Sequence, residues 1–488
     1  MTDRSAAAVA GTAPAPPARL EPNAIGVAQD TVIGMASVAP AASVGLTLAT
    51  LAAATAYGGV PNIIVIAIPM LIIANAYRRL NLWNANCGAS FEWVGRAISP
   101  YLGFLTGWLM IAGYITGAIA GVEVLGPSVL AVFGANATST WPNIGIATGV
   151  TLVMLMIAVI GIRITARTQV AMASVEYVIL IGFAIVGLVW VLGHHSGTFP
   201  ITRGWFSLSG IGGKGSAVDG FVISVFIFSG WDGTVYVNEE VKHRRRNPGR
   251  AAMMATLLVT VIFVLSYLGL QGVVSPARLQ AAGQTGSALV YVSQVLGGSG
   301  GAKVMAFALA LSVIAAVGTA IVLTARIIYG MASYRTLPEF LANVSRRFNT
   351  PVAASVVVGV LIIALTWVYL LATSIQSAFS DVVNVSGQLF GAFYILTALA
   401  AVVYYRRRVF TSVWDALTLG VLPLAAAGFL AWILVTYLQT TYQTAATRPQ
   451  VWSLVGVVIA GVVLMIVARF VLRSPFFQIQ RESDTQKH

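Results

Sequence analysis

Charge and cysteine are both scarce in this chain of 488 residues. Only 9% of the residues are charged, 58% are hydrophobic, and the mean hydropathy is +0.86. A soluble domain of this size has no need of so much apolar surface, so the composition excludes one and indicates an integral membrane protein with many helices. The single cysteine, Cys87, excludes a disulfide within the chain.

Motifs for the common enzyme chemistries are absent as well. The sequence has no nucleotide-binding loop and no visible pairing of a nucleophile with a base. His194 and His195 have no spaced Cys or carboxylate partners, so we expect no metal site and no cofactor. The net charge of +13 does not indicate nucleic acid, because the bases stand in short clusters between apolar runs. We therefore expect a protein that is not an enzyme, surrounded by membrane lipid.

Twelve apolar segments are long enough to cross a bilayer, which takes about 20 residues per helix. They predict an all-α membrane protein with about 12 transmembrane helices. The predicted spans are 27–53, 60–78, 99–131, 143–162, 169–193, 217–237, 251–273, 302–330, 352–374, 380–404, 413–437 and 450–472.

Lysine and arginine are divided unevenly between the two sides of these spans. With alternate loops assigned to alternate sides, 23 of the 28 basic residues share a side with the N-terminus. The positive-inside rule then predicts a multi-pass protein of the cell (inner) membrane with both termini in the cytoplasm. The basic residues on the other side are Arg203, Lys214, Arg278, Lys303 and Arg448.

Two of the predicted spans are interrupted at membrane depth. In the first, residues 34–43 read GMASVAPAAS, and Pro40 removes a backbone donor. In the sixth, residues 228–233 read FSGWDG, and the Asp232 carboxylate costs about 2.5–3.5 kcal/mol at the bilayer centre. Because irregular backbone at this depth persists only where it is buried or lines a cavity, the two breaks predict a binding site.

The interruptions lie five spans apart, which predicts an inverted repeat in a transporter core of residues 26–404. The halves would cover about 27–193 and 217–404, with helices 11 and 12 in 405–475. We expect cytoplasmic tails at 1–25, which is rich in Ala and Pro and predicted to be disordered, and at 476–488.

The two breaks would place half-helices face to face. Such half-helices offer N–H groups to an anion and carbonyls to a cation, which suits an amino acid.

Four stretches of the chain resemble the amino acid–polyamine–organocation (APC) transporter superfamily, which has the leucine-transporter-type fold. Residues 86–108 (NCGASFEWVGRAISPYLGFLTGW) resemble the family's segment at the start of helix 3. Residues 226–250 (FIFSGWDGTVYVNEEVKHRRRNPGR) resemble its helix 6 motif. Residues 324–351 resemble its helix 8 exit, and residues 34–44 match helix 1 only in part. The chain has Pro40-Ala41-Ala42 where the family usually has Gly-small-Gly, so a ligand has less room there.

The resemblance implies a substrate site at the two breaks. Backbone N–H groups of Ala41, Ala42 and Ser43 would hold a carboxylate. Phe226 would be a gating aromatic, with Phe228 and Trp231 as alternatives. Asp232 would contact a substrate amine or, as we favour, hold the unwound backbone or take part in coupling. The candidate substrate-binding residues are Ser37, Pro40, Ala41, Ala42, Ser43, Tyr114, Phe226, Phe228, Gly230, Trp231 and Asp232.

Glu176 in the fifth span is the predicted coupling residue. It stands where the resemblance places a lysine in some proton-coupled relatives, close to the ion site of sodium-coupled ones, and a glutamate there can carry a proton. The alternative is a hydrogen bond between helices. The eighth span has no adjacent hydroxyl pair, which disfavours a sodium site of the family type.

Glu239 and Glu240 stand at the inner end of the sixth span, beside Lys242 and Arg244–Arg246. We interpret them as an inner gate built of ion pairs, with a solvated run of charges as the alternative.

Together these features predict a secondary active transporter. It would import an amino acid or a small amine or polyamine by alternating access, with protons as the coupling ion. An amino acid exchanger is the alternative within the same class. A channel or a transporter-like sensor is the alternative from a different class.

Overall fold

The computed structural model describes residues 19–55, 58–135, 139–195, 197–207, 214–285, 287–372, 375–445 and 447–482. Twelve helical segments in this part of the chain are long and apolar enough to cross a membrane, which confirms the expected number. The first 18 and the last six residues of the expected tails lie outside the described residues.

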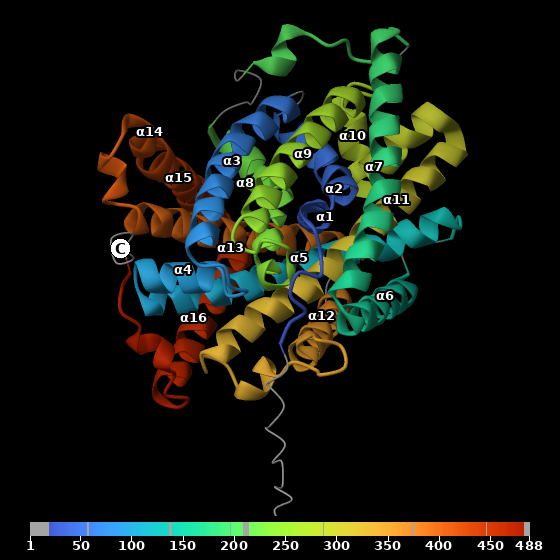
Figure 1. Cartoon of the computed structure of the whole chain (residues 1–488). Helices are drawn as coiled ribbons and strands as arrows, with labels where there is room; N and C mark the ends of the chain where they lie inside the picture. Colours follow the sequence, from blue (N-terminus) through green and yellow to red (C-terminus); the bar gives the residue numbers. More distant parts are fainter. Residues whose placement is uncertain are drawn as a thin grey trace, which may run out of the picture.

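The helices follow the order of the predicted spans (Figure 1). Their bounds are α1 Val27–Val38, α2 Pro40–Thr55, α3 Gly59–Trp83, α4 Ser90–Ala97, α5 Pro100–Val132, α6 Thr140–Ile160, α7 Ile162–Leu192, α8 Lys214–Ile227, α9 Asn247–Leu270, α10 Pro276–Thr285, α11 Ala288–Ser333, α12 Val352–Ala372, α13 Ile375–Tyr404, α14 Val413–Asp415, α15 Leu422–Gln443 and α16 Arg448–Phe470. The largest departure from prediction is α11, which starts 14 residues before the expected span at residue 302 and is kinked at Gly297 and Gly298.

The first span breaks at a single residue. α1 ends at Val38, Ala39 has a left-handed φ of 51°, and α2 begins at Pro40. Proline suits this place because the first N–H of a helix has no partner within the helix. The break is therefore where the sequence predicted it, but it is narrower than an unwound segment.

The sixth span also breaks where expected. α8 ends at Ile227, Gly230 has a φ of 111°, and the chain continues as 3-10 turns at Trp231–Val235 and Asn238–Glu240. A β-carbon on Gly230 would lie 2.8 Å from Ser37 Oγ, so the two breaks touch. Both spans lie in the interior of the bundle (Figure 1).

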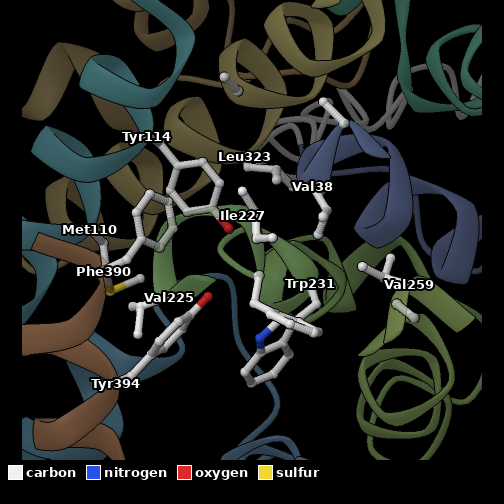
Figure 2. Packing of buried hydrophobic residues seen from close by; sticks show 14 of the residues in the cluster. Val38, Met110, Tyr114, Val225, Ile227, Trp231, Val259, Leu323, Phe390 and Tyr394 are labelled. Atoms are coloured by element: carbon white, nitrogen blue, oxygen red, sulfur yellow. The ribbon is translucent and has the colours of Figure 1, made fainter. Parts of the chain in front are cut away.

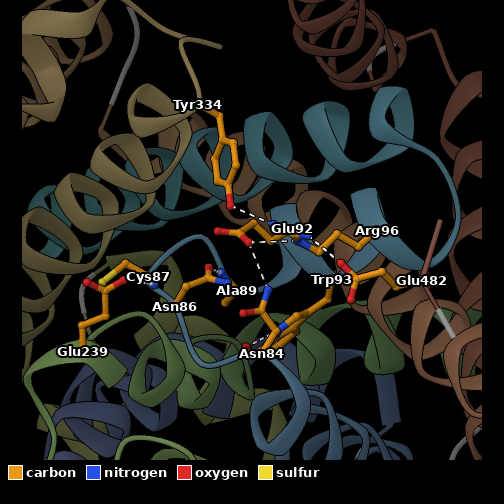
Figure 3. Close-up of polar contacts among 10 residues, drawn as sticks. All are labelled: Asn84, Asn86, Cys87, Ala89, Glu92, Trp93, Arg96, Glu239, Tyr334 and Glu482. Carbon is orange, nitrogen blue, oxygen red and sulfur yellow. Dashed lines mark hydrogen bonds and ion pairs between the residues drawn. The ribbon is translucent and has the colours of Figure 1, made fainter. Parts of the chain in front are cut away.

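One end of the bundle, which we name the inner end, is tied together by residues of both expected tails. Ile25 is fully buried and pairs with Val241, so the described end of the N-terminal tail is an ordered part of the fold. At the other terminus, Phe476 stacks on Phe91 of α4 with 4.1 Å between ring centroids. Glu482 also forms an ion pair of 2.7 Å with Arg96 (Figure 3). We name the opposite end of the bundle the outer end.

α4 is a short helix between the second and third spans, and it is buried. Its Glu92 carboxylate accepts hydrogen bonds from Asn84 and Arg96 (Figure 3). Burial raises the pKa of Glu92, whereas the charge of Arg96 acts in the opposite direction.

α7 and α9 touch through two glycines, Gly187 and Gly269. A β-carbon on Gly269 would lie 2.0 Å from the Ala184 carbonyl oxygen, too close for any side chain. Because neighbouring helices in a membrane associate through close backbone packing at small residues, this contact sets the separation of the two helices.

We expect Gly269→Leu to prevent correct assembly of the bundle, because the added side chain must push α7 and α9 apart. The measurement is the yield of monodisperse protein in detergent after size-exclusion chromatography, which should fall by about tenfold. Gly428→Leu on α15 is the matched control, since nothing lies within 4 Å of a β-carbon there. Equal yields of the two variants would contradict this packing.

Candidate functional site

A central cavity of about 60 Å³ lies at the meeting point of the two breaks. Its walls come from α1, α2, α5, α8, α11 and α13. Five of the predicted substrate-binding residues line it: Ser37, Ala42, Ser43, Tyr114 and Phe226. The predicted residues that lie outside its lining are Pro40, Ala41, Phe228, Gly230, Trp231 and Asp232.

The lining of the central cavity is mainly apolar and carries no charged side chain. Its polar side chains are hydroxyls, and two of them are already used: Ser43 donates to the Val38 carbonyl at 2.7 Å and Ser229 to the Phe226 carbonyl at 2.5 Å. The buried Tyr114 hydroxyl lies near Ser37 and Asp232 and forms no well-aligned hydrogen bond among the described residues. A buried polar group without a partner is costly, so Tyr114 is suited to bind a ligand. Sequence reasoning also missed Val313, Ala316 and Phe390 in this lining.

The N-terminus of α2 points its N–H groups at side chains of the protein. Ala41 N–H donates to Glu176 Oε1 at 2.8 Å, and Ala42 N–H donates to Ser312 Oγ at 3.2 Å. The Ser43 N–H donates to the Ala39 carbonyl at 2.8 Å. The three N–H groups expected to hold a substrate carboxylate therefore all have partners within the protein in this conformation.

Glu176 is fully buried on α7 and joins three spans. Its Oε1 atom accepts both the Ala41 N–H bond and a bond from Ser312 Oγ at 2.7 Å. Its Oε2 atom has no hydrogen-bond partner among the described residues. The positive end of α2 stabilises a negative charge at this place. Glu176 thus occupies the position at α2 that an external carboxylate would need.

Asp232 faces tyrosines rather than the central cavity. Tyr394 of α13 donates to Asp232 Oδ1 at 2.7 Å, and Tyr236 donates to Oδ2. The Tyr394 hydroxyl also accepts the Gly230 N–H at 3.3 Å, and its ring stacks on Trp231 at 5.3 Å. Figure 2 shows Tyr114 and Tyr394 beside the ribbon of the broken α8. These contacts support an architectural role for Asp232, in which its charge holds the irregular backbone.

We expect Asp232→Ala to reduce transport at least about tenfold, because it leaves two buried tyrosine hydroxyls without their acceptor, at about 1–3 kcal/mol each. Uptake per molecule of purified protein in proteoliposomes measures this loss. Tyr394→Phe should reduce uptake less, since it removes one hydrogen-bond donor to Asp232 and keeps the ring. Near-normal uptake by both variants would show that the hydrogen bonds around Asp232 are dispensable.

A buried ion pair joins Glu240 to Arg326 of α11 at the inner end. Arg326 Nε lies 2.7 Å from Glu240 Oε2, and its Nη2 lies 2.9 Å from Oε1, with both side chains fully buried. Glu239 instead accepts the Cys87 N–H at 3.1 Å. From the sequence, Glu240 was expected to pair with the nearby Lys242, and Arg326 was not predicted as its partner. The feature that could have indicated Arg326 is its position as an arginine within a long apolar helix.

Removing one partner of the Glu240–Arg326 pair leaves an uncompensated buried charge, which costs about 3–5 kcal/mol. We expect Arg326→Met to lower the midpoint of thermal unfolding strongly. The double variant with Glu240→Gln should recover most of that loss, because no net charge remains buried. Thermal unfolding of the wild type, the two single variants and the double variant checks this, and additive losses in the double variant would contradict the pairing.

The touching breaks and the central cavity belong to a helical membrane bundle of the leucine-transporter-type fold. A solved structure has the same fold: MhsT in complex with L-phenylalanine matches with a TM-score of 0.56 at 16% identity, over 82% of this chain and 98% of that one. Among the described residues, no group of three or more His, Cys, Asp or Glu side chains is placed to hold a metal ion.

The family model described as amino acid permease matches residues 26–472. The protein therefore belongs to the amino acid permease family of the APC superfamily, as the sequence motifs indicated. It is a multi-pass membrane transporter of amino acids and not an enzyme.

Curated relatives are similar to this chain at low identity. The gamma-aminobutyric acid permease of Bacillus subtilis is 23% identical, over 71% of this chain and 72% of that protein. The D-serine/D-alanine/glycine transporter of Escherichia coli is 22% identical, over 70% of this chain and 72% of that protein. The vacuolar cationic amino acid transporter 4 of Arabidopsis thaliana is 24% identical, over 58% of this chain and 48% of that protein.

Proposed function

We propose that this protein imports a small neutral amino acid across the cell membrane, driven by protons that bind Glu176. The observation that carries the proposal is the hydrogen bond from the α2 N-terminus to Glu176, beside the central cavity. A buried ionisable side chain within a membrane bundle is by default a functional residue, because its burial is expensive.

The size and lining of the central cavity support a small neutral substrate. Its volume of about 60 Å³ is well below the roughly 300–1,000 Å³ of sites for drug-sized ligands. No charged side chain lines it to pair with a charged substrate side chain. The C-terminal ends of α1 and α8 carry partial negative charge and favour an ammonium group between them. The names of two relatives, transporters of gamma-aminobutyric acid and of D-serine, D-alanine and glycine, agree with this size.

Coupling would arise because Glu176 and the substrate carboxylate need the same helix end. When Glu176 is ionised, its charge occupies the N-terminus of α2 and repels a second carboxylate. Protonation of Glu176 removes that charge and makes the helix end available to the substrate. A charge-assisted hydrogen bond is worth about 1.5–3 kcal/mol, so protonation would strengthen substrate binding by about tenfold to a hundredfold. By linkage, bound substrate would raise the proton affinity by the same factor.

Alternating access would reverse these steps inside the cell. The buried Glu240–Arg326 pair closes the inner end of the bundle in this conformation, so the central cavity would load from the outer end. We propose that the halves 27–193 and 217–404 are inverted repeats that rock about the touching breaks, with both termini in the cytoplasm. Opening of the inner end would hydrate Glu176, release its proton and then release the substrate.

Glu176→Gln tests this coupling directly. Uptake of radiolabelled glycine, L-alanine and 4-aminobutyrate is measured in proteoliposomes with an inward proton gradient, with and without sodium. The wild type should accumulate at least one of them without sodium. The Gln variant should lose accumulation and keep exchange of internal for external substrate, because exchange needs no net proton movement.

Ser174→Ala is the matched control, since Ser174 is exposed on the same helix and donates only to the Val170 carbonyl. It should keep gradient-driven accumulation. Accumulation that persists in Glu176→Gln would remove Glu176 as the coupling residue, and strict sodium dependence of the wild type would contradict proton coupling. Exchange without accumulation in the wild type would identify the protein as an exchanger.

A further inference from the structure

A second cavity of about 400 Å³ opens at the outer end of the bundle. We name it the outer vestibule, and its polar wall consists mainly of Thr47, Thr50, Asp219, Asn384, Thr440 and Thr447. These residues belong to α2, α8, α13, α15 and the connection from α15 to α16. The outer vestibule is thus separate from the substrate cavity, yet it is built on the same broken spans.

The threonines of the outer vestibule present acceptors. Thr50 donates its hydroxyl hydrogen to the Leu46 carbonyl at 3.2 Å, Thr440 to the Thr436 carbonyl at 3.1 Å, and Thr447 to the Thr441 carbonyl at 2.8 Å. Thr47 likewise donates to the Ser43 carbonyl at 2.5 Å, and its oxygen accepts from the Tyr267 hydroxyl at 2.7 Å, which leaves it one lone pair. A hydroxyl has one hydrogen and two lone pairs, so what these four groups have left to offer is lone pairs.

Asp219 is the only charged residue in the lining of the outer vestibule. It is exposed and forms no ion pair within the part of the chain that the structure describes. A carboxylate surrounded by hydroxyl lone pairs is complementary to a primary ammonium group, which has three N–H donors and a positive charge. The lining of the outer vestibule contains no positively charged side chain that could pair with an anion.

One face of α2 connects the outer vestibule with the central cavity. Ala42 and Ser43 line the central cavity, Thr47 and Thr50 line the outer vestibule, and Leu46 lines both. These positions follow one another at spacings of three and four residues, which places them on one side of the helix. The Leu46 side chain therefore stands between the two cavities.

We propose that the outer vestibule is a binding site for the primary ammonium group of a small amino acid, and that Leu46 is the gate between this site and the central cavity. The identity of the ligand as substrate rests on the proposed function, whereas the preference for a primary ammonium group rests on Asp219 and the hydroxyl wall alone. An amino acid held there is one side chain away from the transport site.

The charge preference is tested with a thiol introduced by Asn384→Cys. Cys87 is buried, so the otherwise unchanged chain is the blank. The variant in proteoliposomes reacts with externally added aminoethyl and sulfonatoethyl methanethiosulfonates, which are a primary ammonium and an anion. For each variant we take the ratio of the rate with the aminoethyl reagent to the rate with the sulfonatoethyl reagent. This ratio should be about tenfold higher for Asn384→Cys than for Ser139→Cys, a variant of an exposed residue.

Added Asp219→Asn should lower this ratio at least about threefold at position 384 and leave it unchanged at position 139. An unchanged ratio at position 384 would overturn the assignment of Asp219. The reaction rates of the thiol do not depend on transport, so this test can fail while the proposed function holds, and the reverse.

Occupancy is tested by protection of the Asn384→Cys thiol. Glycine, L-alanine or 4-aminobutyrate at millimolar concentration should slow its modification. Glycine betaine, which keeps both charges of glycine but has no N–H donor, should not. Protection by none of the three amines, or equal protection by betaine, would overturn the site.

Leu46→Trp separates the outer vestibule from the central cavity. In this background the same amines should still protect the thiol, whereas uptake should fall by about tenfold or more because the gate is blocked. Ala53→Trp is the matched control, because Ala53 is exposed on α2 and lines neither cavity, and it should retain uptake. Loss of protection in Leu46→Trp would show that the ligand sits in the central cavity, and unchanged uptake would remove Leu46 as the gate.

Discussion

Backbone polar groups inside a bilayer must find partners within the protein, and the rest of this structure depends on how that requirement is met at two broken helices. At the first break, Glu176 and Ser312 accept the N–H groups of α2, and Ser43 donates to the end of α1. At the second, Tyr394 accepts the Gly230 N–H and donates to Asp232. Irregular backbone at membrane depth is stable here because neighbouring spans supply a partner for these groups.

The polar groups at the two breaks have different partners, and this difference supports different roles for Glu176 and Asp232. Asp232 has both carboxylate oxygens bound by tyrosine hydroxyls, so its charge is used within the fold. Glu176 has one oxygen bound and one without a partner among the described residues. An acid with unused capacity, at a helix end that favours negative charge, is the better candidate for a proton carrier. These contacts support our proposal of a coupling role for Glu176 and an architectural role for Asp232.

The sequence predicted what depends on local composition. The count of twelve spans follows from hydropathy. The two breaks follow from Pro40 and from the FSGWDG motif, and the buried acid of the fifth span follows from the position of Glu176. It did not predict Arg326, which meets Glu240 across 86 positions of the chain, or Tyr394, which meets Asp232 across 162. Such pairs are set by the packing of distant helices. The occupied N–H groups of Ala41 and Ala42 were missed for the same reason.

The central claim is that Glu176 and a substrate carboxylate share the N-terminus of α2, so that a proton and a substrate bind together. Isothermal titration calorimetry of the purified protein tests it most directly. Substrate is titrated at pH 7.5 in buffers with different ionisation enthalpies, so that the slope of the observed enthalpy counts the protons taken up on binding. The account predicts net proton uptake for the wild type and none for Glu176→Gln. Substrate binding without proton uptake at any pH, or the same uptake in both proteins, would contradict it.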